Sequence, residues 1–245
     1  MRAASSLTLA ILGALTLSDS CSRRVAEPVT KPPAATPAAI VEVSGGKQIS
    51  TIGTPLDQPV VVQVNNSQGA PVAGASVRFR GANGVIFQPP SGVTGSDGQF
   101  TFAVTLGSLA GRYQIAASTT GAGGKTVEVR IAELALGFED SMGRQLNDTY
   151  CARCHDSEST AERVSNHDNL IAKPHSFDDG AFLNKVSDSD LLAIISHGGP
   201  ALGKSAEMPP YEHTLNKSGI AALVAYIRAI ADPPFQSREA VYAQR

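Results

Sequence analysis

The stretch Tyr150-Cys151-Ala152-Arg153-Cys154-His155-Asp156 places two cysteines three positions apart, with a histidine directly after the second. The 245-residue chain has one further cysteine, Cys21, which lies far away near the N-terminus. All five histidines follow Gly137, and so do 15 of the 22 acidic residues. Chemistry that depends on cysteine and histidine is therefore expected in the C-terminal part of the chain.

Three kinds of site use such a pair of cysteines. A zinc site would need further cysteine or histidine ligands, usually a second close pair, and Cys21 is too remote. A thioredoxin-like redox pair belongs to an α/β unit, whereas the sequence on both sides of Cys151 has a helical pattern. In the third kind, Cys151 and Cys154 add to the two vinyl groups of a porphyrin and His155 binds its iron. We favour haem, because attachment of this kind takes place outside the bacterial cytoplasm and the chain begins with an export signal.

That export signal is predicted over residues 1–20. Arg2 gives a positive start, and Leu7–Leu17 is an apolar run of eleven residues, shorter than the roughly 20 of a transmembrane helix. Cys21 follows directly, and the segment resembles the lipidation site of bacterial lipoproteins, although Ser18 stands where that family usually has leucine. Lipidation of Cys21 and ordinary secretion after the same cleavage both stay open. Either outcome places the protein in the periplasm or the cell envelope.

Residues 21–39 form a proline-rich linker between the signal and the first domain. Four prolines fall within Glu27–Ala39, and the segment has no apolar periodicity. Such a composition favours an extended, semi-rigid spacer.

Residues 40–136 show alternation of apolar and polar side chains in short runs separated by turn signals. The clearest runs are Val60–Val64, Val77–Phe79, Phe100–Val104 and Val127–Ile131. Period-two runs of this kind predict a β-sandwich. The sequences V-V-V-Q-V-N-N-S-Q-G-A-P-V-A-G-A-S-V-R-F and T-G-S-D-G-Q-F-T-F resemble the group 1 bacterial Ig-like domain of intimin and invasin type. This resemblance implies an Ig-like sandwich that acts as a spacer or an adhesive module, and we favour the spacer.

A helical period begins at Gly137. An apolar stripe with a spacing of four residues leads into the cysteines: Phe138, Met142, Leu146 and Tyr150. Ser187–Asp190 has the spacing of a capping box and opens a second helix, which Gly198 ends. Asn216 is expected to cap a third helix, which stops before Asp232-Pro233-Pro234.

His155 needs a partner on the opposite face of the haem. Once the signal is removed, Met142 and Met208 are the remaining methionines. Met142 lies on the helix that leads into Cys151 and is on the wrong side to cross the ring. Met208 follows His155 by 53 residues and precedes two prolines that would hold its thioether in place. His197 is the alternative distal ligand, although a helix-end or surface role is preferred. Surface roles are expected for the others: His167, His175 and His213.

The region from Gly137 to about Pro234 resembles a class I monohaem cytochrome c. Gly143 matches the small residue of that family's first helix, and Tyr226 matches the aromatic residue of its last helix. The resemblance implies that these two helices cross where the two residues meet. Asn147 departs from the family, which commonly has an aromatic residue there.

Leu146 or Tyr150 is expected to fill the space that this departure leaves. The resemblance also implies that a proline carbonyl accepts a hydrogen bond from the His155 ring, and Pro174 is the candidate.

The predicted molecule is multidomain, with an all-β Ig-like sandwich followed by an all-α class I cytochrome c domain. Its parts are a signal peptide at 1–20, the linker at 21–39, the sandwich at 40–136, the cytochrome domain at 137–235 and a C-terminal tail at 236–245. One covalent haem c is predicted, with thioether bonds to Cys151 and Cys154 and with His155 and Met208 as axial ligands.

The predicted function is electron transfer to and from redox protein partners, and not catalysis. A formal net charge of -2 gives no sign of nucleic-acid binding. Two alternatives stay open: an adhesion or interaction protein that contains haem, and a peroxidase-like haem enzyme with an open distal site.

Overall fold

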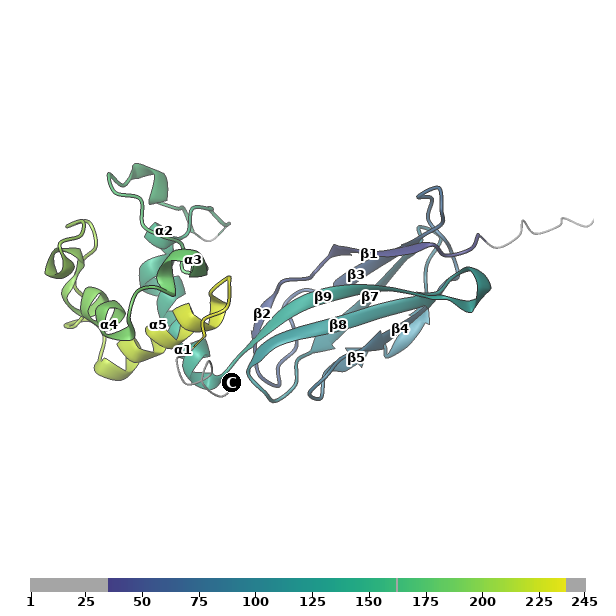
Figure 1. Ribbon diagram of the computed structural model, residues 1–245, viewed down its shortest axis with the longest axis horizontal. Helices are drawn as coiled ribbons and strands as arrows, with labels where there is room; N and C mark the ends of the chain where they lie inside the picture. The colour runs from purple at the N-terminus through teal and green to yellow at the C-terminus, as the bar shows by residue number, and fades with distance from the viewer. Residues whose placement is uncertain (1–34, 162, 237–245) are drawn as a thin grey trace, which may run out of the picture. The chain divides into compact units, whose positions relative to one another are not determined.

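The structure is a computed structural model that describes residues 35–161 and 163–236 (Figure 1). The predicted signal peptide, Cys21, most of the proline-rich linker and all of the tail beyond Gln236 lie outside the described residues. Within the described ranges, no helix is both long and apolar enough to cross a membrane.

The first part of the described chain is a sandwich of two β-sheets (Figure 1). One sheet has the strand order β1-β3-β7-β5, with β1 at Ala39–Ser44, β3 at Val60–Asn65, β7 at Gln99–Thr105 and β5 at Ile86–Gln88. The other has the order β2-β9-β8-β4-β6, with β2 at Ile49–Thr51, β9 at Thr126–Leu136, β8 at Gly111–Thr120, β4 at Ser76–Arg80 and β6 at Ser91–Val93. Strand β2 pairs with β9 in parallel, and the other pairs are antiparallel. A short 3₁₀ turn at Ala122–Gly124 joins β8 to β9.

The core of the sandwich comes from the inward-facing side chains that the alternation predicted. Val60, Val62 and Val64 of β3 are fully buried, and so are Phe102 and Val104 of β7. Four phenylalanine rings form a cluster with centroid separations from 3.9 to 6.4 Å: Phe79, Phe87, Phe100 and Phe102. Residues 40–136 contain no cysteine, so apolar packing and this ring cluster hold the two sheets together without a disulfide.

Tyr113 supplies a further feature of Ig-like sandwiches. It is buried near the start of β8, and its hydroxyl donates a hydrogen bond of 2.8 Å to the carbonyl oxygen of Leu109. In Ig-like folds, a tyrosine whose hydroxyl donates a hydrogen bond to the backbone a few residues upstream is called a tyrosine corner. The predicted β-sandwich is confirmed.

Glu133 of β9 is a charged residue inside the protein, with 3% of its surface exposed. Its Oε2 accepts a hydrogen bond of 2.7 Å from the Gln48 backbone N–H, whereas its buried Oε1 has no hydrogen-bond partner. The pKa of Glu133 is raised to about 7. Burial is the main cause, the Gln48 bond opposes the rise, and the charge of Glu42 adds to it.

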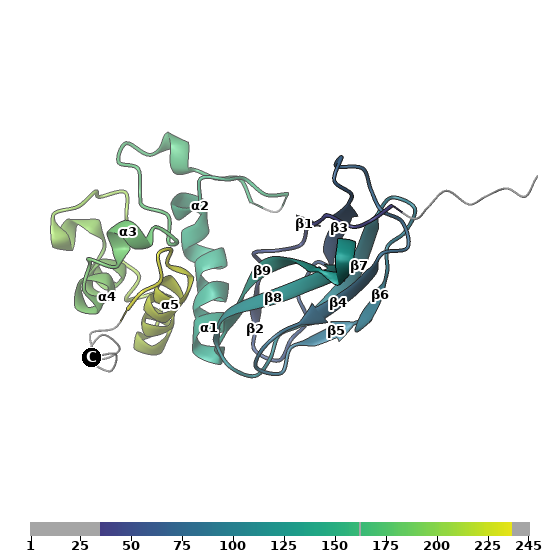
Figure 2. The ribbon, with the colours of Figure 1, turned by 45° about the vertical axis from the view of Figure 1, so that its right-hand side comes forward.

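The second part of the chain is helical (Figures 1 and 2). Its α-helices are α1 at Phe138–Leu146, α2 at Ala152–His155, α3 at Gly180–Leu183, α4 at Asp188–His197 and α5 at Lys217–Ile230. A π-helical turn, Asn147–Cys151, joins α1 to α2, and 3₁₀ turns lie at His167–Asn169 and Gly199–Leu202. The predicted helix caps are confirmed: the Ser187 side chain accepts a bond from the Asp190 N–H, and Asn216 accepts one from the Gly219 N–H.

Helices α1 and α5 pack against each other at Gly143, as the resemblance implied. A β-carbon at position 143 would overlap the Ala222 carbonyl oxygen and would lie 2.7 Å from the Tyr226 Cβ. Only glycine therefore allows the two backbones to approach this closely.

The apolar stripe that begins on α1 is not the buried face of this helix. Phe138 is 76% exposed and Tyr150 is 39% exposed, whereas Leu146 packs against the helical core. The face that α1 and the π-helical turn bury instead carries Gly143, Asn147 and Cys151. The close contact between α1 and α5 explains why this face is buried, because α1 can approach α5 so closely only on the side that contains Gly143.

Candidate functional site

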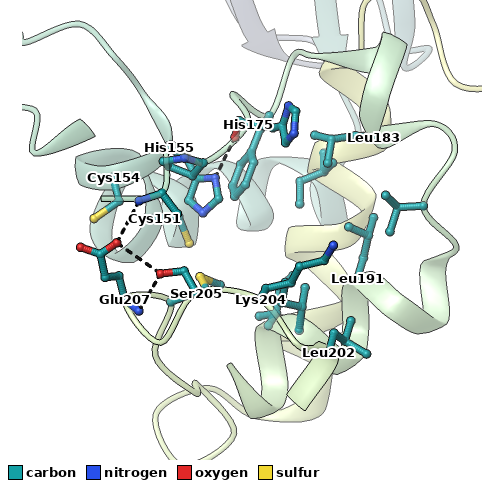
Figure 3. A pocket seen from close by; sticks show the side chains of 18 of the residues that line it. Cys151, Cys154, His155, His175, Leu183, Leu191, Leu202, Lys204, Ser205 and Glu207 are labelled. Carbon is teal, nitrogen blue, oxygen red and sulfur yellow. Dashed lines mark hydrogen bonds between the residues drawn. The ribbon is translucent and has the colours of Figure 1, made fainter. Parts of the chain in front are cut away.

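The helical part encloses a cavity of about 400 Å³ (Figure 3). Four of the residues that line it are those predicted for haem. Cys151 ends the π-helical turn, Cys154 and His155 lie in α2, and Met208 lies in the loop before α5. The structure thus brings together residues that are up to 57 positions apart in the sequence. The volume lies in the usual range of cofactor pockets, about 300–1,000 Å³.

The rest of the cavity wall is mainly apolar. Leu183, Leu191 and Ile195 are buried members of the helical core and also line the cavity. Further apolar lining comes from Phe177, Pro209 and Ile227. A flat apolar cofactor in this cavity would be surrounded by hydrocarbon, which lowers the local dielectric constant and excludes water.

His155 is held with one ring nitrogen directed at the backbone. Its Nδ1 lies 2.9 Å from the carbonyl oxygen of His175. A carbonyl can only accept a hydrogen bond, so Nδ1 carries the proton and the lone pair of Nε2 is free to bind a metal. Burial lowers the pKa of His155, an effect that the bond to His175 opposes, so the ring is neutral at neutral pH.

The acceptor of this bond is not the carbonyl of Pro174, and the prediction of that residue is wrong by one position. Successive carbonyls in an extended segment point in different directions, so only one of them can face the ring. The ring of Phe177 also packs on His155, with centroids 4.4 Å apart and an interplanar angle of 36°. Nothing in the sequence around Phe177 distinguishes this contact in advance.

No disulfide joins the two cysteines of the motif, Cys151 and Cys154. The pKa of Cys151 is raised to about 12, mainly by burial and to a smaller extent by the nearby Cys154 and Asp148. Redox pairs and zinc sites both use cysteine as a thiolate. Within the described ranges, no group of three or more His, Cys, Asp or Glu residues could hold a metal ion. The surroundings of Cys151 therefore favour neither the thioredoxin-like nor the zinc interpretation.

The Met208 loop is anchored to the end of α4. The Met208 carbonyl accepts a hydrogen bond of 2.9 Å from the Gly199 N–H, and the Met208 N–H donates one of 3.3 Å to the Ser205 carbonyl. Gly198 has a positive φ of 81°, and a β-carbon there would lie 2.8 Å from the Met208 carbonyl oxygen. The two glycines that end α4 thus make room for the backbone of the methionine loop.

Of the remaining histidines, His197 has its side chain 55% exposed and does not line the cavity. Its Nδ1 lies 3.1 Å from Glu212 Oε2. His167 pairs with Asp168, and His213 is at the surface. The surface role expected for His175 is wrong in part, because this residue lines the cavity and its ring stacks on Phe182 at a centroid separation of 3.6 Å.

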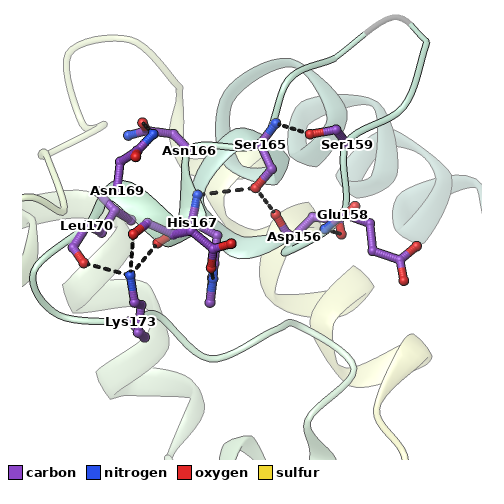
Figure 4. Close-up of polar contacts among 10 residues, drawn as sticks. Asp156, Glu158, Ser159, Ser165, Asn166, His167, Asn169, Leu170 and Lys173 are labelled. Atoms are coloured by element: carbon purple, nitrogen blue, oxygen red, sulfur yellow. Dashed lines mark hydrogen bonds and ion pairs between the residues drawn. The ribbon is translucent and has the colours of Figure 1, made fainter.

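A polar network holds the loop that follows His155 (Figure 4). Ser165 Oγ donates a bond of 2.6 Å to the Asp156 carbonyl and accepts one of 3.1 Å from the His167 N–H. The Lys173 ammonium donates to three carbonyl oxygens at 2.7 to 3.2 Å, those of His167, Asp168 and Leu170. Arg163 also donates to the Ala152 carbonyl and to Asp156. These bonds hold the loop in its conformation. The sequence did not predict this conformation, because the segment has no apolar periodicity.

Two family models match separate parts of the chain. Residues 57–132 match the bacterial Ig-like domain (group 1), and residues 139–227 match the model described as cytochrome C oxidase, cbb3-type, subunit III. The chain therefore carries an Ig-like domain followed by a cytochrome c-type domain. No curated protein matches the chain.

Solved structures similar to this chain include Ig-like domains of bacterial adhesins. The D00-D0 domain of intimin is 13% identical, with 41% of this chain and 48% of that chain covered and a TM-score of 0.30. Yersinia pseudotuberculosis adhesin InvE is 16% identical, with 41% and 32% covered and a TM-score of 0.31. Invasin, a bacterial integrin-binding protein, is 19% identical, with 40% and 19% covered and a TM-score of 0.30. The match spans about half the length of the intimin fragments, 48% and 50%.

The cytochrome c-type domain indicates a haem cofactor and an electron carrier. Together with the bacterial Ig-like domain it also indicates an exported protein.

Proposed function

We propose that the protein is an exported electron carrier with a single haem c. Cys151 and Cys154 would hold the haem by thioether bonds, and His155 and Met208 would bind the iron from opposite faces. One observation carries this proposal: these four side chains line the same apolar cavity, although Met208 is distant in the sequence. The bound haem would supply a one-electron couple that the side chains of the chain do not have.

Each residue around the cavity would have a distinct role in the proposed electron transfer. The His175 carbonyl orients the His155 ring and leaves its Nε2 available for iron. The Met208 thioether is a soft ligand that favours ferrous iron and so raises the reduction potential. If His155 and Met208 both bound the iron, no coordination position would stay open for a substrate, and the protein would then be a carrier and not a peroxidase-like enzyme.

The arrangement of α1 and α5 supports the class I all-α fold for this domain. The contact of Gly143 with Ala222 and Tyr226 is the helix crossing that the family resemblance implies. The Ig-like domain would be a spacer that holds the haem domain away from the membrane. At that distance the haem domain would meet its redox protein partners.

The test begins with the mass of the exported protein, in which the peptide that contains Cys151 and Cys154 should carry one haem. Met208→Ala should then keep this haem but lose the weak sulfur-to-iron band at the red end of the ferric spectrum. Its reduction potential should fall by on the order of 0.1 V, since axial ligands set potentials over about 0.8 V. Visible spectra and a redox titration measure both effects.

His197→Ala is the matched control, because this residue lies outside the cavity. It should change neither the spectrum nor the potential. A low-spin Met208→Ala protein with an unchanged potential, together with a high-spin His197→Ala protein, would show bis-histidine ligation instead.

A further inference from the structure

Glu207 directly precedes Met208, and its carboxylate reaches a different segment of the chain (Figure 3). It accepts hydrogen bonds from the backbone N–H of Ile171, at 3.2 Å to Oε1 and 3.1 Å to Oε2, and from that of Ala172, at 3.3 Å to Oε2. Ser205 adds two further bonds, because its hydroxyl donates to Oε2 and accepts from the Glu207 N–H, both at 3.2 Å. The carboxylate thus ties the loop before Met208 to residues 35 or 36 positions earlier.

The segment that receives this carboxylate also holds His155. Ala172, Lys173 and Pro174 line the cavity, and the next residue, His175, offers the carbonyl that fixes the His155 ring. Glu207 therefore joins the loop of one predicted iron ligand to the segment that orients the other. On the other side, the Met208 loop is held to the end of α4 by the Gly199 N–H.

We propose that Glu207 is a positioning residue that keeps Met208 in place at the distal side of the cavity. This inference rests on the proposed ligation of iron by Met208. Hydrogen bonds to a carboxylate are stronger than those between neutral groups, but Glu207 is exposed and solvent weakens each of its bonds. The restraint on the loop comes from several such bonds acting together. Without it, the loop keeps its bond to Gly199 but loses its connection to residues 171–172. The methionine then leaves the distal position more often, and a small external ligand takes its place.

The test uses the complete haem-loaded protein and imidazole as the external ligand. Imidazole is titrated into the ferric wild type, Glu207→Gln and Glu207→Ala, and loss of the sulfur-to-iron band reports replacement of Met208. Imidazole should bind roughly two- to fivefold more tightly to Glu207→Ala, because the solvent-exposed bonds to the carboxylate are lost. Glu207→Gln keeps one acceptor oxygen and should give a smaller increase in affinity. Haem content should be the same in all three proteins.

Glu212→Gln is the matched control. It makes the same change of charge four residues after Met208, but Glu212 pairs with His197 and does not line the cavity. Its affinity for imidazole should equal that of the wild type. An equal increase in Glu212→Gln would show a general effect of charge and would overturn the inference.

Two other outcomes separate the inference from the proposed function. If the wild type has the sulfur-to-iron band and both Glu207 variants bind imidazole as the wild type does, the positioning role is overturned while Met208 ligation stands. If the wild type lacks the band, Met208 ligation is itself overturned, and the inference with it. Glu207→Gln is nearly isosteric, so it keeps the test valid if Glu207→Ala loses its haem.

Discussion

At the scale of single residues, ionisation of the buried Glu133 carboxyl group destabilises the folded β-sandwich. Burial raises its pKa from 4.5 to about 7. Between these two values the folded protein binds more protons than the unfolded protein, so the free energy of unfolding falls as the pH rises. This decrease in the free energy of unfolding amounts to about 1–3 kcal/mol and is complete about one pH unit above the folded-state pKa.

The side chain in Glu133→Gln cannot ionise. The free energy of unfolding of this variant should therefore fall less between pH 5 and pH 8 than that of the wild type. At pH 8 it should be more stable than the wild type by about 1–3 kcal/mol. Urea denaturation of the sandwich, followed by far-UV circular dichroism at both pH values, measures the difference. Glu128→Gln is the control, because the Glu128 carboxylate pairs with Arg80 and Arg130 in a solvent-exposed position. An equal pH dependence in wild type and Glu133→Gln would contradict the prediction.

The residues of the site differ in how far the sequence could predict them. Cys151, Cys154 and His155 form a motif with a fixed spacing, and Met208 could be selected because few methionines are available. The His175 carbonyl, the Phe177 ring and the Glu207 carboxylate could not be predicted. They lie in segments without apolar periodicity, whose paths depend on polar contacts such as those of Lys173.

At the scale of elements, the crossing of α1 and α5 depends on the absence of a side chain at position 143. Gly143→Ala should force the two helices apart and lower the free energy of unfolding of the helical domain by about 1–3 kcal/mol. Urea denaturation of the haem-loaded protein, followed by Soret absorption, measures this loss. Gly219→Ala in α5 should cost less, because a β-carbon there lies no nearer than 3.3 Å to side-chain atoms of Asn216 and Leu146. Equal stabilities of wild type and Gly143→Ala would show that the crossing tolerates a wider separation.

Elements with strong local signals were predicted and the others were not. The strands around Val62 and Phe102 follow their alternation, and α4 and α5 begin at the caps that the sequence indicated. The buried face of α1 does not follow its apolar stripe, because contact with α5 selects the side of Gly143 over the more apolar side of Phe138. Tertiary packing thus overrides the local apolar pattern.

At the scale of the whole molecule, any lipid attachment to the membrane would depend on Cys21, which lies outside the described residues. If Cys21 is lipidated, Cys21→Ser should move the protein from the membrane fraction to the soluble fraction. A lipoprotein cysteine carries several acyl chains, and more than one chain is needed for stable anchoring. Cell fractionation with immunodetection measures the distribution, and haem content should not change. Ser22→Ala is the control and should stay at the membrane. A wild type found only in the soluble fraction would indicate ordinary secretion.

The sandwich has no cysteine, and its phenylalanine cluster takes the place of a disulfide between the sheets. This has a consequence for maturation after export, because thiols in oxidising compartments are readily joined. The Ig-like domain can fold without disulfide-forming enzymes, whereas the proposed thioether bonds would require Cys151 and Cys154 to stay reduced until they react with haem. The same oxidising enzymes would thus be irrelevant to the first domain and harmful to the second. On the proposed function, the supply of reductant outside the cytoplasm would limit how much of the chain matures into a working carrier.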